Sequence, residues 1–341
     1  MSNGYARLLV GFGISAVLLA LLLRTIDVPT LINDIGSADL RFVLPAIALY
    51  FAALWLRSVR WGFLLPVSGR STSTLFRALT VGFTVNNLLP MRMGELARAY
   101  LMARWCGVAY GNTLASVVVE RVLDGLALAL LLLTALFFVP APPPYLLALG
   151  LAVGGAFCGG ALLLALAAWR SDGIAGMGRV IARPLPSMVG AIVQRLAASF
   201  AHGLRLVRGW RLLAKLAGLS VLAWACELGL FYVLMLGFSL PGSLPLAFLG
   251  GSAANFATLV PSSPGYVGTF DGTLVKVLAD TAGLSADRAT AYTVVVHATL
   301  FIPVTVVGLL ILWRAHISFG QLTRLGRRRA APAPVAEPVA R

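Results

Sequence analysis

Residues 86–95, NNLLPMRMGE, place two asparagines, a proline, an arginine, a glycine and a glutamate in ten positions of an otherwise apolar chain. A bilayer offers no water to backbone groups that a helix break leaves unpaired, so irregular backbone at membrane depth must lie against protein or a water-filled cavity. The segment therefore indicates either a loop at the membrane surface or the turn of a helical hairpin that enters the bilayer and returns.

The composition around this segment is that of an integral membrane protein. Of the 341 residues, 59% are hydrophobic and 11% are charged, and the mean hydropathy is +0.91. A helix that crosses a hydrocarbon core of about 30 Å needs roughly 20 mostly apolar residues. Six runs qualify, at residues 8–23, 42–65, 114–139, 145–169, 212–238 and 289–313. We expect an all-α polytopic membrane protein whose first run is a retained helix rather than a cleaved signal peptide.

The net charge of +15 at pH 7 reflects membrane topology rather than nucleic-acid binding. The basic residues gather in the segments that follow the second, fourth and sixth runs, so the positive-inside rule places both termini in the cytoplasm. We expect a single transmembrane domain over residues 1–315 that includes an amphipathic cytoplasmic linker at 170–210. Residues 316–341 are expected to form a basic and then disordered cytoplasmic tail.

Several kinds of chemistry are not indicated. Cys106, Cys158 and Cys226 are far apart in the sequence, which supports neither a disulfide framework nor a metal site. No P-loop pattern is present, so nucleotide hydrolysis by that route is not predicted. We expect no catalytic residue, metal or cofactor.

The polar interruption at residues 86–95 has a counterpart in the second half of the chain. GFTVNNLLPMRMGE, which begins at Gly82, aligns with GGSAANFATLVPSSPGYVGTFD, which begins at Gly250, so that Asn86 meets Asn255. In the same order, SVVVE at residues 116–120 corresponds to TVVVH further along the chain. The common order and spacing predict an internal duplication.

Each copy reads as a span, an interrupted apolar hairpin and another span, over residues 41–139 and 211–313. The charge pattern gives the hairpins, at residues 75–104 and 246–280, opposite topologies. We therefore expect two re-entrant helical hairpins in an inverted repeat, as in many secondary transporters.

The first hairpin carries charges that need an explanation at membrane depth. Glu95 lies near the start of a half-helix, and Arg92 and Arg98 lie within one turn of it. At positions i and i+3, Glu95 and Arg98 can pair locally. The set either holds an anionic headgroup or only caps and neutralises the turn.

The long helices carry further charges. Glu120 and Asp124 share one helical face beside Arg121, so they should share a basic residue or one of them should be protonated, in a structural ion cluster or a proton-coupled step. Arg57 and Glu227 are separated by the repeat offset, which predicts a salt bridge between the copies. The alternative for Glu227 is a protonated acid that faces a cavity.

The second hairpin offers either an anion cradle or an ordinary sharp turn. It supplies glycines for close backbone approach, neutral hydroxyl donors and Asp271. His297, on the following run, is a packing residue or a proton relay. The residues that we expect to contact the substrate are Asn86, Asn87, Arg92, Glu95, Arg98, Glu120, Arg121, Asp124, Asn255, Ser262, Ser263, Gly265, Gly268, Thr269 and Asp271.

Four segments carry a resemblance to a known family: RSVRWGFLL at 57–65, NNLLPMRMGELARAYLM at 86–102, SVVVERVLD at 116–124 and PSSPGYVGTFD at 261–271. Together they resemble the lysylphosphatidylglycerol synthase transmembrane-region family, also called flippase-like integral membrane proteins, over about residues 5–315. In the multiple peptide resistance factors this region is the flippase half, which a soluble aminoacyltransferase domain follows. The resemblance implies a stand-alone lipid transporter without the synthase domain. The family usually shows Pro-Gly-Gly and a final Glu where this chain has Tyr266 and Asp271.

We therefore expect a transporter that moves an amphipathic lipid, whether anionic, aminoacylated, glycosylated or hopanoid-type, between leaflets of a bacterial inner membrane. The energy for transport would come from a lipid gradient, from ion or proton coupling, or from consumption of the lipid on the far side of the membrane. The expected partners are membrane lipids and a lipid-modifying enzyme. The alternatives are a non-transporting scaffold for such an enzyme and, as a third class, a membrane enzyme acting on a lipid phosphate.

Overall fold

The computed structural model describes residues 28–65, 71–89, 93–169, 209–260 and 264–317, together with the single positions 183, 190 and 194. Within these ranges the chain is helical, and no strand occurs. Five described helices are long and apolar enough to cross a membrane: Leu40–Leu64, Tyr110–Phe138, Pro144–Leu163, Trp210–Gly237 and Ala286–Arg314. The all-α polytopic class is confirmed. The run at 8–23, nearly all of the linker at 170–210 and most of the tail lie outside the described residues.

The helices form two units with the same order of long, short, short and long helices. The first unit contains α3 (Val43–Leu64), α4 (Thr72–Leu88), α5 (Gly94–Cys106) and α6 (Tyr110–Phe138). The second contains α10 (Trp210–Gly237), α11 (Leu244–Ala257), α12 (Thr269–Ala282) and α13 (Ala286–Arg314). Outside the units lie α2 (Val28–Ser37), η1 (Leu40–Phe42) and α7 (Pro144–Trp169), and η2 (Pro264–Tyr266) joins α11 to α12.

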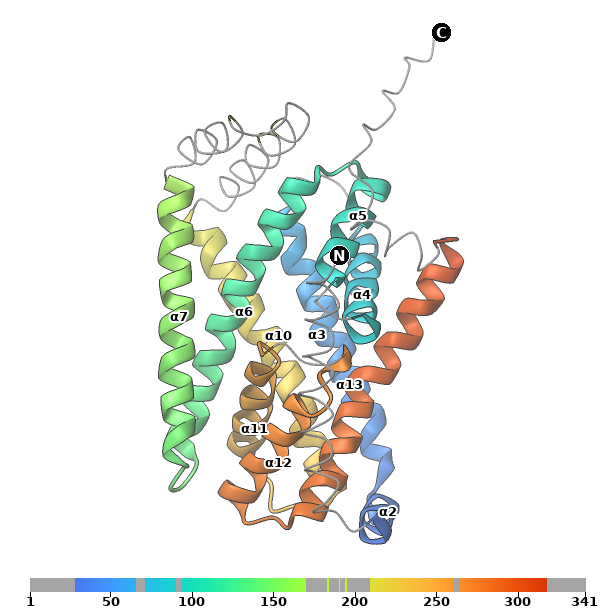
Figure 1. Ribbon diagram of the computed structural model, residues 1–341, viewed down its shortest axis with the longest axis vertical. Coiled ribbons are helices and arrows are strands. Elements are labelled where there is room, and N and C mark those ends of the chain that lie inside the picture. The colour runs from blue at the N-terminus through green and yellow to red at the C-terminus, as the bar shows by residue number, and fades with distance from the viewer. Residues whose placement is uncertain are drawn as a thin grey trace.

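The two units pack against each other in a reciprocal way. The first long helices, α3 and α10, pack side by side, whereas α4 packs on α13 and α11 packs on α6. Each unit thus places the first helix of its short pair against the last long helix of the other unit. Figure 1 shows α4 and α5 in the upper half of the molecule and α11 and α12 in the lower half. Since α4 also contacts η2, the hairpins meet inside the molecule.

Polar side chains from the motifs close both hairpin turns. Asn86 accepts a hydrogen bond from the Gly94 backbone N–H at 2.7 Å, across the turn between α4 and α5. In the second hairpin, Asp271 accepts one from the Gly268 N–H at 3.0 Å. A buried N–H at a helix start has no partner within its own helix, so these side chains satisfy groups that the bilayer would leave unpaired.

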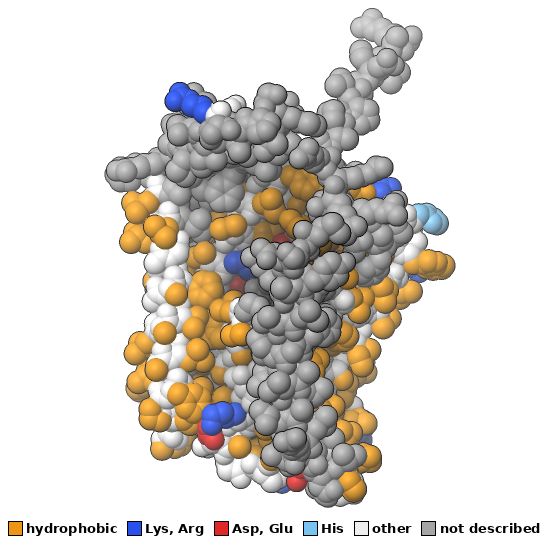
Figure 2. Space-filling view, in the orientation of Figure 1, with side chains coloured by type: hydrophobic (Ala, Val, Ile, Leu, Met, Phe, Trp, Pro, Cys, Tyr) orange, Lys and Arg blue, Asp and Glu red, His pale blue; other side chains and the backbone are white. Residues whose placement is uncertain are grey.

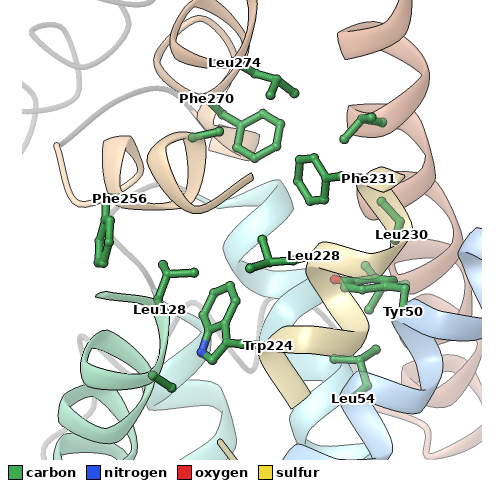
Figure 3. Close-up of a cluster of buried hydrophobic side chains, with 14 of the residues drawn as sticks. Tyr50, Leu54, Leu128, Trp224, Leu228, Leu230, Phe231, Phe256, Phe270 and Leu274 are labelled. Carbon is green, nitrogen blue, oxygen red and sulfur yellow. The ribbon is translucent and has the colours of Figure 1, made fainter. Parts of the chain in front are cut away.

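An apolar core joins the units around these turns. Figure 3 shows Tyr50 from α3, Leu128 from α6, Trp224 and Phe231 from α10, and Phe270 from α12 converging in one cluster. All five side chains are buried. Because they come from both units, the core holds the hairpins and the long helices in a fixed relation.

The crossing of α4 and α5 predicts a sharp sensitivity at Gly94. A Cβ atom at this position would lie 2.0 Å from the Gly82 carbonyl oxygen and 2.6 Å from Asn86 Oδ1. A backbone oxygen cannot rotate away, so Gly94→Ala should lower the free energy of unfolding by about 1–3 kcal/mol in an SDS titration of the micellar protein. Gly272→Ala on α12, which would meet nothing within 4 Å, should be neutral or stabilising. Equal effects of the two substitutions would contradict this packing.

Candidate functional site

A cavity of about 280 Å³ lies between the two units. The first hairpin contributes Asn86 and Asn87 to its wall, and the second contributes Asn255, Gly265 and Tyr266. Charged side chains from α3, α6 and α10 and aromatic rings from seven helices complete most of the lining. Figure 2 shows apolar side chains over most of the described surface on the visible face, with basic and acidic side chains near mid-height. A cavity lined mostly by apolar and aromatic side chains, with a few polar and charged groups among them, is the usual form of a ligand site.

The cavity lies at the depth of the middle of the spans. Asp124 is the fifteenth of the 29 residues of α6, which places it about 21 Å from either end of that helix at 1.5 Å per residue. An unpaired charge at the centre of a bilayer costs about 2.5–3.5 kcal/mol on insertion scales. The charged residues here must therefore be paired or serve a function.

Arg57 and Glu227 form a buried ion pair between α3 and α10. Their side chains are 3% and 7% exposed, and the Arg57 guanidinium also lies 4.5 Å from the ring centroid of Trp224. The ion pair that their spacing predicted is therefore present, and it joins the two units at the cavity wall.

Asp124 pairs with Arg60, a residue that the sequence analysis did not select. Arg60 Nη1 donates to Asp124 Oδ1 and to Ser220 Oγ, both at 2.6 Å. Trp224 Nε1 donates to the same carboxylate oxygen at 3.1 Å. Arg60 lies three residues after Arg57 in the same motif, and this helical spacing was the signal that could have identified it.

Glu120 pairs with Arg98 in a two-pronged geometry. Arg98 Nη1 and Nη2 donate to the two Glu120 oxygens at 2.9 and 2.7 Å, and both residues are buried. The local Glu95–Arg98 pair that their spacing allowed does not form, since Arg98 binds Glu120 and Glu95 lies 4.0 Å from Arg121. A bidentate guanidinium stabilises the fully buried Glu120 carboxylate more than it would stabilise the partly exposed carboxylate of Glu95. Glu120 and Asp124 do share a basic residue, but it is Arg60 rather than Arg121: Arg60 lies 2.6 Å from Asp124 Oδ1 and 3.9 Å from Glu120 Oε1.

Arg121 is the loosely paired cation of the cavity wall. Its Nη2 lies 3.4 Å from Glu120 Oε1, an oxygen that Arg98 already occupies, and 4.0 Å from Glu95 Oε1. Its side chain is 34% exposed, and its Nε has no hydrogen-bond partner among the described residues. Because Arg121 lines the cavity, is partly exposed and makes only these long contacts, its guanidinium can bind an anion there.

The asparagines of the motifs brace the hairpins while they line the cavity. Asn87 Nδ2 donates to Thr305 Oγ1 at 2.9 Å, which ties the end of α4 to α13. Asn255 Nδ2 donates to the Gly251 carbonyl at 2.9 Å within α11.

The turn of the second hairpin uses the predicted glycines. Gly265 and Gly268 have φ of 74° and 92°, values that favour glycine, and a Cβ at Gly265 would meet Phe301 at 2.7 Å. Tyr266 also has a positive φ, 61°, at the position where the family usually has a second glycine. Thr269 Oγ1 donates to the Tyr266 carbonyl at 3.2 Å, so it supports the turn.

Some expected site residues lie outside the described part of the chain: Arg92, Ser262 and Ser263. His297 lines the cavity, and its Nδ1 lies 2.6 Å from Asp271 Oδ1. The sequence analysis named both residues without predicting their contact. Within the described ranges, no group of three or more His, Cys, Asp or Glu side chains could hold a metal ion.

The comparison with known families agrees with this arrangement. The model of the lysylphosphatidylglycerol synthase TM region matches residues 8–308. The chain belongs to this family. The resemblance drawn from the four motifs is confirmed.

Curated relatives of this lysylphosphatidylglycerol synthase TM region are distant. Glycosyltransferase AglD of Haloferax volcanii is 26% identical over 332 residues, which cover 87% of this chain and 52% of AglD. The chain thus spans about half the length of AglD. A UPF0104 membrane protein of Methanothermobacter thermautotrophicus is 25% identical over 271 residues, which cover 76% of this chain and 79% of that protein. These relatives and the family support a lipid-related role in a membrane.

Proposed function

We propose that the protein moves a lipid with an anionic headgroup between the two leaflets of a membrane. The observation that carries this proposal is the charged cavity at mid-span whose wall is built from both hairpins. A binding site at the meeting point of two interrupted helical segments is the arrangement found in many secondary transporters. No P-loop occurs in the sequence, so the drive is a lipid gradient, an ion gradient or consumption of the lipid.

The proposal treats the two units as an inverted repeat. Their identical helix order, the exchange of α4 onto α13 and α11 onto α6, and the opposite placement of the short pairs in Figure 1 support it. Alternating access then consists of one unit rocking against the other around the cavity. The proposed location is a bacterial inner membrane with both termini in the cytoplasm, which follows from the excess of arginine in the segments assigned to that side.

The dimensions of the cavity favour a headgroup over a whole lipid. A volume of about 280 Å³ is just below the usual range of ligand sites, about 300–1,000 Å³. Leu259, at the end of α11, lines the cavity and is also 48% exposed, and the neighbouring Val260 is exposed as well. We infer that the acyl chains stay in the bilayer along this apolar edge while the headgroup passes through the cavity.

Arg121 is the residue assigned to the lipid phosphate. Arg57 is paired with Glu227, and Arg60 is fully buried outside the cavity lining, whereas Arg121 lines the cavity and is 34% exposed. A guanidinium binds phosphate oxygens through parallel N–H bonds. A hydrogen bond to a charged group contributes about 1.5–3 kcal/mol, so Arg121→Gln should slow transport by at least about tenfold.

The test is transfer of fluorescent phosphatidylglycerol between leaflets of liposomes that contain the purified protein, read by dithionite quenching. Wild type should accelerate transfer over empty liposomes, and Arg121→Gln should remove most of the acceleration. Arg104→Gln removes an exposed arginine of α5 outside the cavity and should match wild type. Transfer at the empty-liposome rate, for anionic and zwitterionic lipids alike, would exclude transport.

A second candidate is a membrane partner of a lipid-modifying enzyme. The observation in its favour is the relative that is named a glycosyltransferase and is about twice as long as the matched region. This candidate predicts a stable enzyme that copurifies with the protein and a cellular role that Arg121→Gln leaves intact. Loss of that role in Arg121→Gln, with no such enzyme recovered, would favour the transporter.

A further inference from the structure

His297 and Asp271 form an acid–imidazole pair between α13 and α12. The Nδ1–Oδ1 distance is 2.6 Å, and the side chains are 17% and 13% exposed. The imidazole lies between the rings of Phe270 and Phe301, at centroid distances of 5.4 and 5.9 Å. His297 also lines the cavity. An imidazole, a side chain that can take up or release a proton, is therefore held at the proposed headgroup site.

Asp271 links this pair to the turn of the second hairpin. Its Oδ2 accepts the Gly268 N–H at 3.0 Å, while its Oδ1 contacts His297. The turn that it holds includes Gly265 and Tyr266, both of which line the cavity. A change in charge on the imidazole therefore acts on the carboxylate that fixes one wall of the site.

The pair occupies the place that a permanent ion pair occupies in the other unit. Arg98 on α5 binds Glu120, the eleventh residue of α6, and Asp271 on α12 binds His297, the twelfth residue of α13. In each unit the second short helix is thus tied to the last long helix. A guanidinium does not lose its proton in the physiological range, whereas an imidazole does. Of these two ties, the second is the one that can titrate.

The other charged groups around the imidazole come from several helices. α13 packs against α2, α3, α4, α10 and α12. The charged group that α12 supplies is Asp271, and α3 and α10 supply Arg57 and Glu227, which pair with each other. The side chains of α4 in the cavity wall are neutral, and α2 supplies no residue of that wall. The charged cavity residues of α6 are Arg121 and Asp124. With Asp271 counted, these groups carry one net negative charge when the imidazole is neutral, and protonation of His297 brings their sum to zero.

We propose that His297, held by Asp271, is a proton-binding site that couples proton uptake to binding of an anionic headgroup in the cavity; this rests on the proposed transport function. The step is the addition of one proton to the imidazole, with no other bond made or broken. The imidazolium attracts the headgroup, so an anion binds more tightly when His297 is protonated. Linkage is reciprocal, so the bound anion in turn promotes proton uptake.

The test measures binding of dihexanoylphosphatidylglycerol to the purified full chain by calorimetry at pH 5.5 and pH 8.0. Two buffers of different ionisation enthalpy report the protons exchanged. In the wild type, affinity should fall about tenfold from the lower to the higher pH, within the usual range of coupling between two sites. Binding near neutral pH should be accompanied by net proton uptake.

Three variants test whether His297 is the residue responsible for the pH dependence and the proton uptake. His297→Gln can still donate to Asp271 but cannot titrate, so it should lose both the pH dependence and the proton uptake. His297→Arg should bind at the low-pH affinity at both pH values. The matched control is His316→Asn, at an exposed histidine beyond the end of α13 with a φ of 50°, a conformation that asparagine tolerates. This control should keep the wild-type profile.

Wild-type proton uptake that persists unchanged in His297→Gln would overturn the proposal. If His297→Gln does not fold, the measurements on the wild type alone test the proposal. Wild-type binding that is independent of pH and takes up no proton would also overturn the proposal. The liposome assay separates this inference from the proposed function. Lipid transfer that is independent of pH and of His297 would support the transport function and contradict the proton site. Proton-coupled binding without lipid transfer would support the proton site and contradict the transport function.

Discussion

Arg98→Met should be among the most destabilising single substitutions in the protein, with a loss of about 3–5 kcal/mol in the free energy of unfolding. It removes the two hydrogen bonds that hold the Glu120 carboxylate and leaves that charge buried, with Arg60 Nη2 at 3.9 Å and Arg121 Nη2 at 3.4 Å as its remaining cations. The guanidinium also stacks 4.0 Å from the ring centroid of Trp61. SDS titration of the protein in mixed micelles measures the loss.

The double variant Arg98→Met/Glu120→Met identifies the cause. Because it removes both charges, it should recover most of the stability, since apolar replacement of a whole buried pair is often neutral. Glu95→Gln should cost less than about 1 kcal/mol, because Glu95 is partly exposed and lies 4.0 Å from Arg121. Rescue of Arg98→Met by Glu95→Gln rather than by Glu120→Met would contradict the observed pairing.

Glu227→Gln should also cost about 3–5 kcal/mol. The substitution keeps the side-chain shape but leaves the buried Arg57 guanidinium without its partner at the junction of α3 and α10. The double variant Arg57→Leu/Glu227→Leu should recover most of the loss in the same SDS titration. A neutral Glu227→Gln would instead favour the other interpretation of the sequence, in which Glu227 is a protonated acid that faces the cavity.

The sequence alone predicts the helical plan because that plan follows from local signals. Apolar runs of sufficient length predict the spans, and asparagine, proline and glycine within apolar sequence predict the two hairpins. The Arg57–Glu227 contact is predictable as well, since the repeat offset relates these two positions. The charge pattern of the sequence cannot show how the two units pack against each other. The helix order and the reciprocal packing in the structure show it.

The choice of partners within the charge cluster is not predictable from spacing. Arg60, Arg98 and Arg121 all lie within reach of Glu120, and the packing of α3, α5 and α6 decides which of them binds it. The His297–Asp271 contact could not be predicted from the sequence for the same reason, because it depends on how α12 and α13 pack. One signal was available: the alignment of SVVVE with TVVVH places His297 at the position of Glu120, a residue that needs a partner on the preceding short helix.

The central claim is that a lipid headgroup enters the cavity between the hairpins, and headgroup crosslinking tests it most directly. Phosphatidylglycerol with a photoreactive headgroup would be reconstituted with the protein, irradiated and mapped by mass spectrometry. The account predicts crosslinks at mid-span, in peptides that contain Leu128 of α6 and Asn255 of α11, and their loss in Arg121→Gln. Crosslinks confined to the helix ends near Trp210 and Trp313, unchanged by Arg121→Gln, would contradict it.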